Sequence, residues 1–492
     1  MSRTFNAEEV LSGVSDWNGN SISFGYDRDG NLARIGYPNG VTETASYDKG
    51  DYTNSIADAT STATLASSVL TRDADSGLTG VSTTGTNAGP NVAYGYNQLG
   101  QVTTYKVGTA AATNYGYDGD DNLAALPNGT TQTFDAAHEL TKTGTAVVSQ
   151  DTRGNLTSQI PAGGYSAYVA YDQANRMSAI YITVGTYATY TYDGDGLRTS
   201  KTVNGTTSTY TWGDTGGSTP LLLSDGSTSY LYGPGGLPVE QINSAGTPTY
   251  LQHDQQGSTD LLTSSAGSVV GTYSYAPYGA TTAHTGTAVT ALRYDGQYAD
   301  DESGLYYLRA RYYNPVTGQF ITRDPAETTT GQPYQYANDD PLAFTDPSGL
   351  FGCGIFHSVC SIASDAGSYV EAHPWQTLGY VAGGVAAVTG LGAIADVGVG
   401  VLGLSAETAG QVAVGAGFVA SGADLPGCIG GSTSGCIGVA ANLLGAGLGR
   451  AGLAAAEGTI PFQLLAAKAF SVGLGATAWD LLSEVPVAGA CT

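Results

Sequence analysis

Two aspartates that each precede a proline, and one arginine before them, are residue types that can hydrolyse a peptide bond. Asp324 and Asp346 stand before Pro325 and Pro347, and Arg311 lies 13 residues before Asp324. Two carboxyl groups that share a proton can cut a peptide, because the ionised one activates water while the protonated one polarises the carbonyl. A proline restricts the preceding residue to extended conformations, and a nearby guanidinium would hold one carboxylate ionised. These residues therefore form a candidate aspartic-type site.

Other interpretations of the same residue types remain open. Asp-Pro pairs also begin ordinary turns, and an arginine among tyrosines also stacks or forms salt bridges on a β-surface. Asp300 and Glu302 are further carboxylates nearby and are less favoured participants. His253 and Asp254 stand beside a Gly-Ser turn, where we expect hydrogen bonding within the fold and no catalysis.

A repeat predicts the elements that must position these residues. Tyr-Asp or Tyr-Asn pairs recur with a spacing of 21 residues, at Tyr26 and Tyr47, Tyr96 and Tyr117, and Tyr171 and Tyr192. Each unit alternates Tyr, Thr, Val and Ser, which is typical of a strand, and then has an Asp/Gly/Asn cluster that favours a hairpin turn. Because stacked hairpins bury a tyrosine face only against their neighbours, we expect a mainly β fold, an antiparallel sheet that coils into a shell.

Residue usage divides the chain near residue 350. Of the 33 tyrosines, all but Tyr369 and Tyr380 precede residue 351, whereas the five cysteines follow it, at Cys353, Cys360, Cys428, Cys436 and Cys491. An odd number of cysteines without paired CxxC spacing indicates neither a disulfide framework nor a zinc site, so we expect no metal and no cofactor. We predict a repeat shell over 1–228, a distinct β-rich region over 229–350 and a variable region over 351–492.

Charge and the N-terminal sequence restrict partners and location. The formal net charge is −25 and both halves of the chain are acidic, which argues against nucleic-acid binding by the shell. The first residues, MSRTFNAEEVLSGVSDW, lack a basic segment followed by an apolar run. We therefore expect a cytoplasmic protein that becomes secreted or associated with the cell surface by a non-classical route.

The region after residue 350 is apolar and rich in glycine and alanine. Residues 378–404, 409–423 and 437–456 are long stretches with very few charges, and we expect them to be α-helical. His357, His373, Arg450 and Lys468 are scattered without a recognisable catalytic motif. Three interpretations stay open: a membrane-active or translocation segment, a hydrophobic cargo preceding a catalytic part that is missing, and an inert tail.

The stretch from Tyr294 to Leu350 carries a family resemblance. It contains GLYY, ARYY, a P-x-x-G-x-F turn, a first Asp-Pro and a terminal DPSGL. In this order the motifs resemble the Rhs repeat-associated core domain, and with the upstream YD repeats the resemblance covers roughly residues 20–350. The chain departs from the family pattern at Asn314, where Asp is common, and in the AETTT sequence that follows Pro325.

The resemblance implies a fold and an activity. Members of the family form a spiralling β-cage around a C-terminal polypeptide, and several cut their own chain after the leucine of DPxGL. The corresponding bond here is Leu350–Phe351. The family includes polymorphic toxins of bacterial competition, C components of insecticidal toxin complexes, and teneurins. The resemblance thus implies an autoproteolytic cage whose cargo is its own C-terminal segment, with a secretion-system or toxin-complex chain as the partner that closes it. The alternatives are an adhesion module and a truncated fragment without an active toxin.

Overall fold

A computed structural model describes residues 1–159, 167–183, 185–213, 219–325, 327, 331–350 and 353–354 of the 492-residue chain. The chain divides into two compact units, Met1–His357 and Ser358–Thr492, and the account below concerns the first. The apolar stretches predicted to be helical lie outside the described residues. Within the described part, no helix is both long enough and apolar enough to span a bilayer. The division at residue 228 stays a prediction.

The described chain is mainly antiparallel β-structure, which confirms the predicted fold class. In every sheet the hydrogen-bonded neighbours are also neighbours in sequence, so each sheet is a meander. This order follows from the repeat, because a strand followed by a tight turn pairs with the strand that comes next.

The strands of the described residues form seven sheets. The first sheet contains β1 (Ser2–Phe5), β2 (Leu11–Ser15), β3 (Ser21–Tyr26), β4 (Leu32–Gly36), β5 (Thr42–Tyr47), β6 (Thr53–Ala59), β7 (Thr64–Arg72), β8 (Leu78–Thr84), β9 (Val92–Tyr96), β10 (Val102–Val107) and β11 (Thr113–Asn114). Two small sheets contain β12 (Gly116–Tyr117) and β13 (Leu123–Ala125), and β14 (Gln132–Phe134), β15 (Leu140–Thr143) and β16 (Ala146–Val147). The fourth contains β17 (Ser149–Gln150), β18 (Leu156–Gln159), β19 (Ala167–Tyr171), β20 (Met177–Ile182), β21 (Thr186–Tyr192), β22 (Arg198–Val203) and β23 (Thr206–Thr209).

The later sheets belong to the second half of the unit. The fifth contains β24 (Thr211–Gly213), β25 (Leu221–Ser224), β26 (Thr228–Tyr232), β27 (Pro238–Asn243), β28 (Pro248–His253), β29 (Thr259–Ser264), β30 (Val269–Tyr275) and β31 (Thr281–Gly286). The sixth contains β32 (Tyr298–Asp300), β33 (Leu305–Leu308), β34 (Arg311–Asn314) and β35 (Gln319–Phe320), and the seventh β36 (Phe344–Thr345) and β37 (Cys353–Gly354). Three 3-10 turns are η1 (Pro234–Gly236), η2 (Tyr294–Gly296) and η3 (Ala337–Asp339).

The structure explains the Tyr-Asp repeat physically. The Tyr47 hydroxyl donates to the carbonyl of Leu32, 15 residues earlier, at 2.8 Å, and the Tyr192 hydroxyl donates to Met177 in the same way at 2.6 Å. The aspartate that follows each tyrosine caps the next turn: the Asp193 carboxylate accepts the backbone N–H groups of Asp195 and Leu197. Tyrosine thus ties one hairpin to the previous one, and aspartate closes the hairpin that follows.

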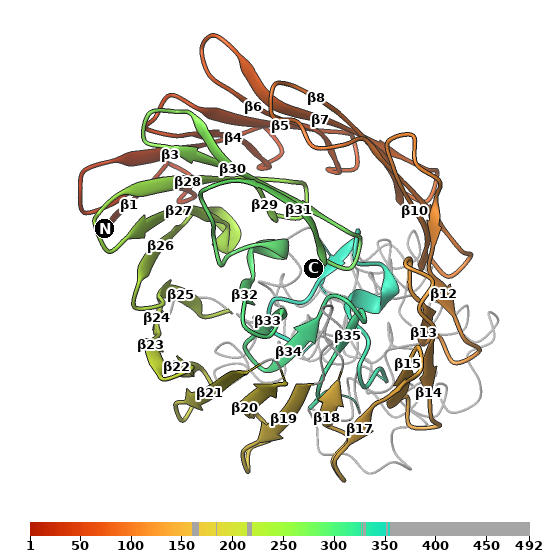
Figure 1. Cartoon of the computed structure of the whole chain (residues 1–492). Coiled ribbons are helices and arrows are strands. Elements are labelled where there is room, and N and C mark those ends of the chain that lie inside the picture. The colour runs from red at the N-terminus through yellow and green to blue at the C-terminus, as the bar shows by residue number, and fades with distance from the viewer. Residues whose placement is uncertain are drawn as a thin grey trace, which may run out of the picture. The chain divides into compact units, whose positions relative to one another are not determined.

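The coiling places strands from distant parts of the chain in two layers. In Figure 1 the strands follow a curved path, and β28 to β31 lie inside the arc made by the first strands. Contacts confirm this layering. The Tyr37 hydroxyl donates to the Leu251 carbonyl at 2.6 Å, and one hydrophobic cluster joins Ile22 and Ile35 to Val239 and Tyr250. The shell therefore overlaps itself along a seam between β2–β6 and β27–β29.

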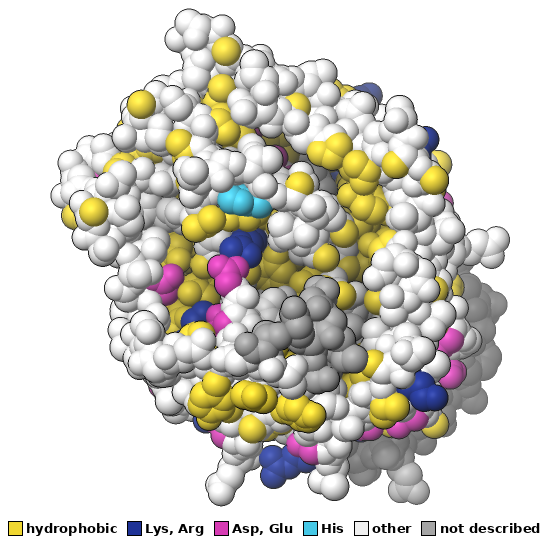
Figure 2. Space-filling view, viewed as in Figure 1, with side chains coloured by type: hydrophobic (Ala, Val, Ile, Leu, Met, Phe, Trp, Pro, Cys, Tyr) yellow, Lys and Arg dark blue, Asp and Glu magenta, His cyan; other side chains and the backbone are white. Residues whose placement is uncertain are grey.

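The short sheet β32–β35 lies within the shell and packs against its wall (Figure 1). Leu305, Tyr307 and Tyr312 share a core with Met177 and Ile180 of the wall. On the face shown in Figure 2 the molecule is hollowed at its centre, and hydrophobic side chains gather inside the hollow. We call β32–β35 and the chain that follows it to Leu350 the plug.

Candidate active site

The β33–β34 hairpin and the turn at 346–350 create the candidate site. Leu308 pairs with Arg311 across the hairpin, so Arg311 begins β34 with its side chain buried. The later turn docks on this hairpin, because the Ala310 N–H donates to the Ser348 carbonyl at 3.2 Å. Gly349 permits the close approach: it has φ +71°, and a Cβ there would lie 2.5 Å from the Leu308 carbonyl oxygen.

Arg311, Asp324 and Asp346 lie close together in the structure. Nη2 of Arg311 lies 3.4 Å from Oδ2 of Asp346 and 3.7 Å from Oδ2 of Asp324. All three side chains are buried, with residue exposures of 2%, 5% and 2% for Arg311, Asp324 and Asp346. The guanidinium also lies over the ring of Phe320, 3.6 Å from its centroid. Two carboxyl groups thus share one buried cation.

The arginine is strongly desolvated. Burial lowers the pKa of the Arg311 guanidinium, although the charges of Asp346 and Asp324 oppose this shift. A guanidinium stays charged even in such surroundings, so the site contains a permanent cation. Its Nε donates to the Gly349 carbonyl, while the buried Nη1 has no hydrogen-bond partner within the described ranges.

Asp346 holds the backbone on which the predicted cleavage site lies. Its Oδ1 accepts the N–H of Leu350 at 3.1 Å and the hydroxyl of Ser348 at 3.0 Å. The Ser348 hydroxyl in turn lies 3.2 Å from the Leu350 nitrogen. Asp346 therefore contacts the residue whose carbonyl belongs to the predicted scissile bond, and Arg311 contacts the residue before it. Phe351, on the other side of that bond, lies outside the described residues.

The spare carboxylates Asp300 and Glu302 lie in a different network. Asp300 forms a 2.5 Å ion pair with Arg198, and Lys201 contacts Asp300 at 2.8 Å and Glu302 at 3.0 Å. Arg198 and Lys201 lower the pKa of Asp300 against its burial. Arg198 is fully buried beneath several tyrosine rings, including that of Tyr307 at 4.5 Å. This network joins β22 of the wall to the start of the plug.

His253 lies at the seam between the shell layers. Its Nε2 is 2.6 Å from the Pro238 carbonyl and its Nδ1 is 3.2 Å from a Glu43 carboxylate oxygen. Asp254 accepts the backbone N–H groups of Gln256 and Ser258, both at 2.9 Å, as a turn cap. Both residues make hydrogen bonds within the fold.

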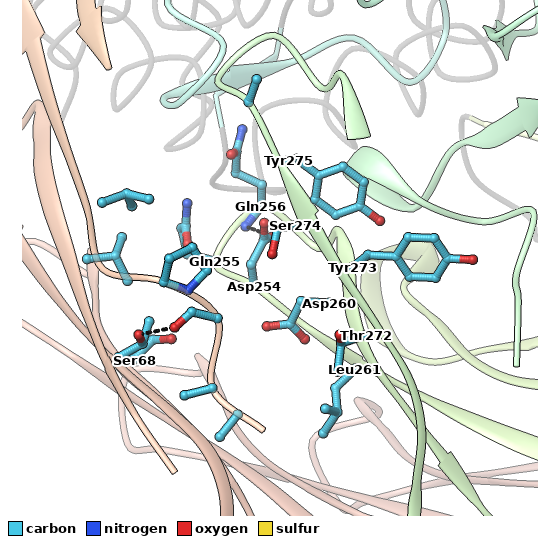
Figure 3. A pocket seen from close by; sticks show the side chains of 18 of the residues that line it. Ser68, Asp254, Gln255, Gln256, Asp260, Leu261, Thr272, Tyr273, Ser274 and Tyr275 are labelled. Atoms are coloured by element: carbon cyan, nitrogen blue, oxygen red, sulfur yellow. Dashed lines mark hydrogen bonds between the residues drawn. The ribbon is translucent and has the colours of Figure 1, made fainter. Parts of the chain in front are cut away.

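A cavity of about 150 Å³ lies between the first sheet and β29–β30, and its lining contains none of Arg311, Asp324 and Asp346. Figure 3 shows Asp254 and Asp260 at its wall. Burial, followed by the charges of Asp254 and Glu43, raises the pKa of Asp260. No group of three or more His, Cys, Asp or Glu side chains in the described part of the chain could hold a metal ion.

Sequence reasoning missed two residues that contact the 346–350 turn. Ser348 donates to Asp346, as given above, and Arg309 donates from Nη1 to the Pro347 carbonyl at 2.8 Å. The placement of Ser348 within the DPSGL motif was a usable signal, because serine two residues after aspartate commonly bonds to it in a turn. Nothing in the sequence distinguishes Arg309 from an ordinary surface arginine.

Comparison with known proteins agrees with this architecture. The family model described as Teneurin YD-shell matches residues 41–342. The tRNA nuclease WapA of Bacillus subtilis is 32% identical over 277 residues, which are 52% of this chain and 12% of that protein. The toxin subunit YenC2 of Yersinia entomophaga is 37% identical over 99 residues, which are 19% of this chain and 10% of YenC2.

Solved structures show the same fold. The crystal structure of TcdB2-TccC3 superposes with a TM-score of 0.58 at 18% identity, covering 71% of this chain and 21% of that one. The chain belongs to the Teneurin YD-shell family, and it spans about an eighth or less of the length of the two relatives compared. It forms a YD-repeat shell related to those of bacterial toxin proteins.

Proposed function

We propose that this shell cuts its own chain between Leu350 and Phe351 and so releases its C-terminal segment as the cargo of a bacterial toxin-delivery or competition system. The observation that carries the proposal is the buried Arg311 between two aspartates, one of which binds the N–H of Leu350. An intramolecular substrate needs no binding step, because the fold itself holds the bond beside the acids.

The two aspartates take different roles in the proposed hydrolysis. The partners of Asp346 given above are an N–H, an O–H and a cation, all of which favour its ionised form. Asp346 therefore accepts a proton from water, and the water oxygen bonds to the Leu350 carbonyl carbon. Asp324 supplies a proton to the carbonyl oxygen. The C–N bond then breaks as the proton taken by Asp346 goes to the Phe351 nitrogen and one hydroxyl proton of the intermediate returns to Asp324. This leaves a carboxyl group on Leu350 and an amine on Phe351, with both aspartates in their starting states.

Arg311 contributes charge as well as position. The buried Nη1 donor has no partner within the described ranges, and a buried donor of this kind is costly unless something uses it. In the proposed mechanism it stabilises the negative charge that develops on the Leu350 oxygen as water adds. A charge-assisted donor in a water-poor site is effective in this role, since its field is weakly screened.

Two findings support the cargo role of residues 351–492. Hydrophobic side chains gather inside the hollow of the shell (Figure 2), and such a surface suits an apolar polypeptide such as the one after residue 350. A related solved structure, TcdB2-TccC3 with a TM-score of 0.51, is described as lacking a hypervariable C-terminal region. The membrane-active, hydrophobic-cargo and inert interpretations of this segment all remain open.

A partner chain that closes the shell is the second part of the proposal. The match to TcdB2-TccC3 supports a partner of the toxin-complex type.

Conservative substitutions at the acids test the proposal. Asp346→Asn and Asp324→Asn keep side-chain size but remove the ionisable group, so each variant should stay one intact chain on a denaturing gel. Asp301→Asn is the matched control, because the Asp301 side chain is 75% exposed and forms an ion pair with Arg293. Cleavage at the same bond and rate in both active-site variants would show that an external protease cuts the chain.

A further inference from the structure

We propose that Arg309 is a positioning residue for this cleavage, and that it makes cleavage depend on the shell wall being in place. The inference rests on the proposed function and adds a residue and a form of regulation to it. Arg309 donates to the cleavage turn itself, at the Pro347 carbonyl, and holds that turn against groups from two other parts of the fold.

The other contacts of Arg309 belong to the wall and to Gln297, the residue just before the plug. Its Nε donates to the Pro220 carbonyl, just before β25, at 3.1 Å, and its guanidinium lies 5.8 Å from the ring of Trp212 on β24. Nη1 also donates to the side-chain oxygen of Gln297, next to β32. One planar guanidinium thus joins the wall, Gln297 just before the plug, and the turn that ends at Leu350, a geometry that the fixed fork of arginine suits.

The backbone at this position indicates a specific requirement. Arg309 has φ +60°, a left-handed conformation that is unusual for a long side chain and costs about 1 kcal/mol or more. The residue is half-buried, and burial lowers the pKa of its guanidinium. A left-handed backbone and a partly buried charge at one turn residue are expected where the fold requires that side chain in one position.

The position of Pro347 controls the scissile bond. Only Ser348 and Gly349 separate it from Leu350, and Asp346 immediately precedes it. A shift of the Pro347 carbonyl therefore moves both the acid Asp346 and the residue whose peptide bond is cut. Reactions between positioned groups are sensitive to displacements of about 1 Å, which can change rates by about 100-fold.

Arg309 and Arg311 should differ in their effect on pH dependence. Arg311 contacts both carboxyl groups, so it influences their ionisation. Arg309 donates hydrogen bonds to backbone carbonyls and a neutral amide, and its charge acts on Asp346 without a direct contact. Arg309→Lys keeps this charge, so it should lower the rate without moving the pH at which cleavage turns on. This difference separates positioning from electrostatic catalysis.

The experiment follows cleavage of newly made full-length chain. Protein is synthesised in a cell-free system for a short pulse, transferred to buffers from pH 4 to pH 9, and the intact fraction is measured with time on denaturing gels. We compare wild type with Arg309→Ala, Arg309→Lys, Trp212→Leu and Arg311→Lys. Arg72→Ala is the matched control, because Arg72 also donates to a backbone carbonyl, that of Ser76, in a different sheet.

Arg309→Ala should cleave about 10- to 100-fold more slowly at every pH, with a smaller shift of the pH profile than Arg311→Lys. Arg309→Lys, which keeps the charge and the fold, should be slowed less but in the same manner, and Trp212→Leu should show a smaller decrease. Arg311→Lys should shift the pH profile of cleavage.

Three outcomes would contradict these expectations. The positioning role would be overturned if Arg309→Lys and Arg309→Ala cleaved at the wild-type rate, or if their pH profiles shifted as far as that of Arg311→Lys. A wild-type rate in Trp212→Leu beside a slow Arg309→Ala would overturn the link to the wall. A wild-type chain that stays intact would instead refute the proposed function.

Discussion

Glu240 should make the stability of the shell depend on pH. This side chain lies on β27 at the seam between the two layers; it is 0% exposed, and neither carboxyl oxygen has a hydrogen-bond partner in the described structure. Burial, followed by the charge of Asp16, raises the pKa of Glu240 from 4.5 to about 8. The folded protein therefore keeps a proton on Glu240 that the unfolded chain loses at a much lower pH.

The sign and size of the effect follow from this interval. Below about pH 4.5 both states carry the proton, so Glu240 causes no penalty. Between pH 4.5 and about 8 the folded state binds more protons than the unfolded state, so stability falls as pH rises. At 1.36 kcal/mol per pH unit, the full interval corresponds to a loss of about 5 kcal/mol by pH 9.

Glu240→Gln should remove most of this loss, because glutamine has the same size and stays neutral. Urea unfolding at pH 5 and pH 9 measures it: the free energy of unfolding should fall between these pH values by several kcal/mol more in wild type than in the variant. Glu8→Gln, at an exposed position, is the control and should behave as wild type. Parallel losses of stability in wild type and Glu240→Gln would refute the buried-proton argument.

Two further predictions concern the plug. Arg198→Met should lower the free energy of unfolding, measured in urea, by about 3 kcal/mol, because it leaves the buried Asp300 with Lys201 as its one remaining cation among the ion pairs given above; unchanged stability would contradict this. Gly349→Ala should slow cleavage at least about 10-fold while the melting temperature of the shell stays the same, since a Cβ would lie 2.9 Å from the backbone nitrogen of Arg311. Rapid cleavage of the pulse-labelled variant would show that the turn does not need this close approach.

Much of the architecture could be predicted because local sequence patterns determine it. A tyrosine at fixed spacing and an aspartate at the next turn specify the meander, and the structure shows the bonds responsible in Tyr47 to Leu32 and Tyr192 to Met177. The convergence of Arg311, Asp324 and Asp346 was predictable because the family motifs place them in one short region. Their catalytic roles and the bond that is cut stay predictions.

The rest depends on tertiary contacts that no local pattern contains. Tyr37 meets Leu251 because the shell overlaps itself, and the same overlap buries Glu240. Arg309 gains its role from a left-handed turn and from carbonyl groups supplied by two distant segments. Residue types alone could not distinguish the roles of Arg309 and Arg311, because the two arginines differ in the groups that each guanidinium contacts.

The intact mass of the purified full-length protein tests the central claim most directly. Under denaturing conditions wild type should give two masses, one for a chain ending at Leu350 and one for a chain beginning at Phe351. Under native conditions the pieces should stay together, and Asp346→Asn should give the single mass of the uncut chain. A single full-length mass for the folded wild type, or a cut at another bond, would contradict the account.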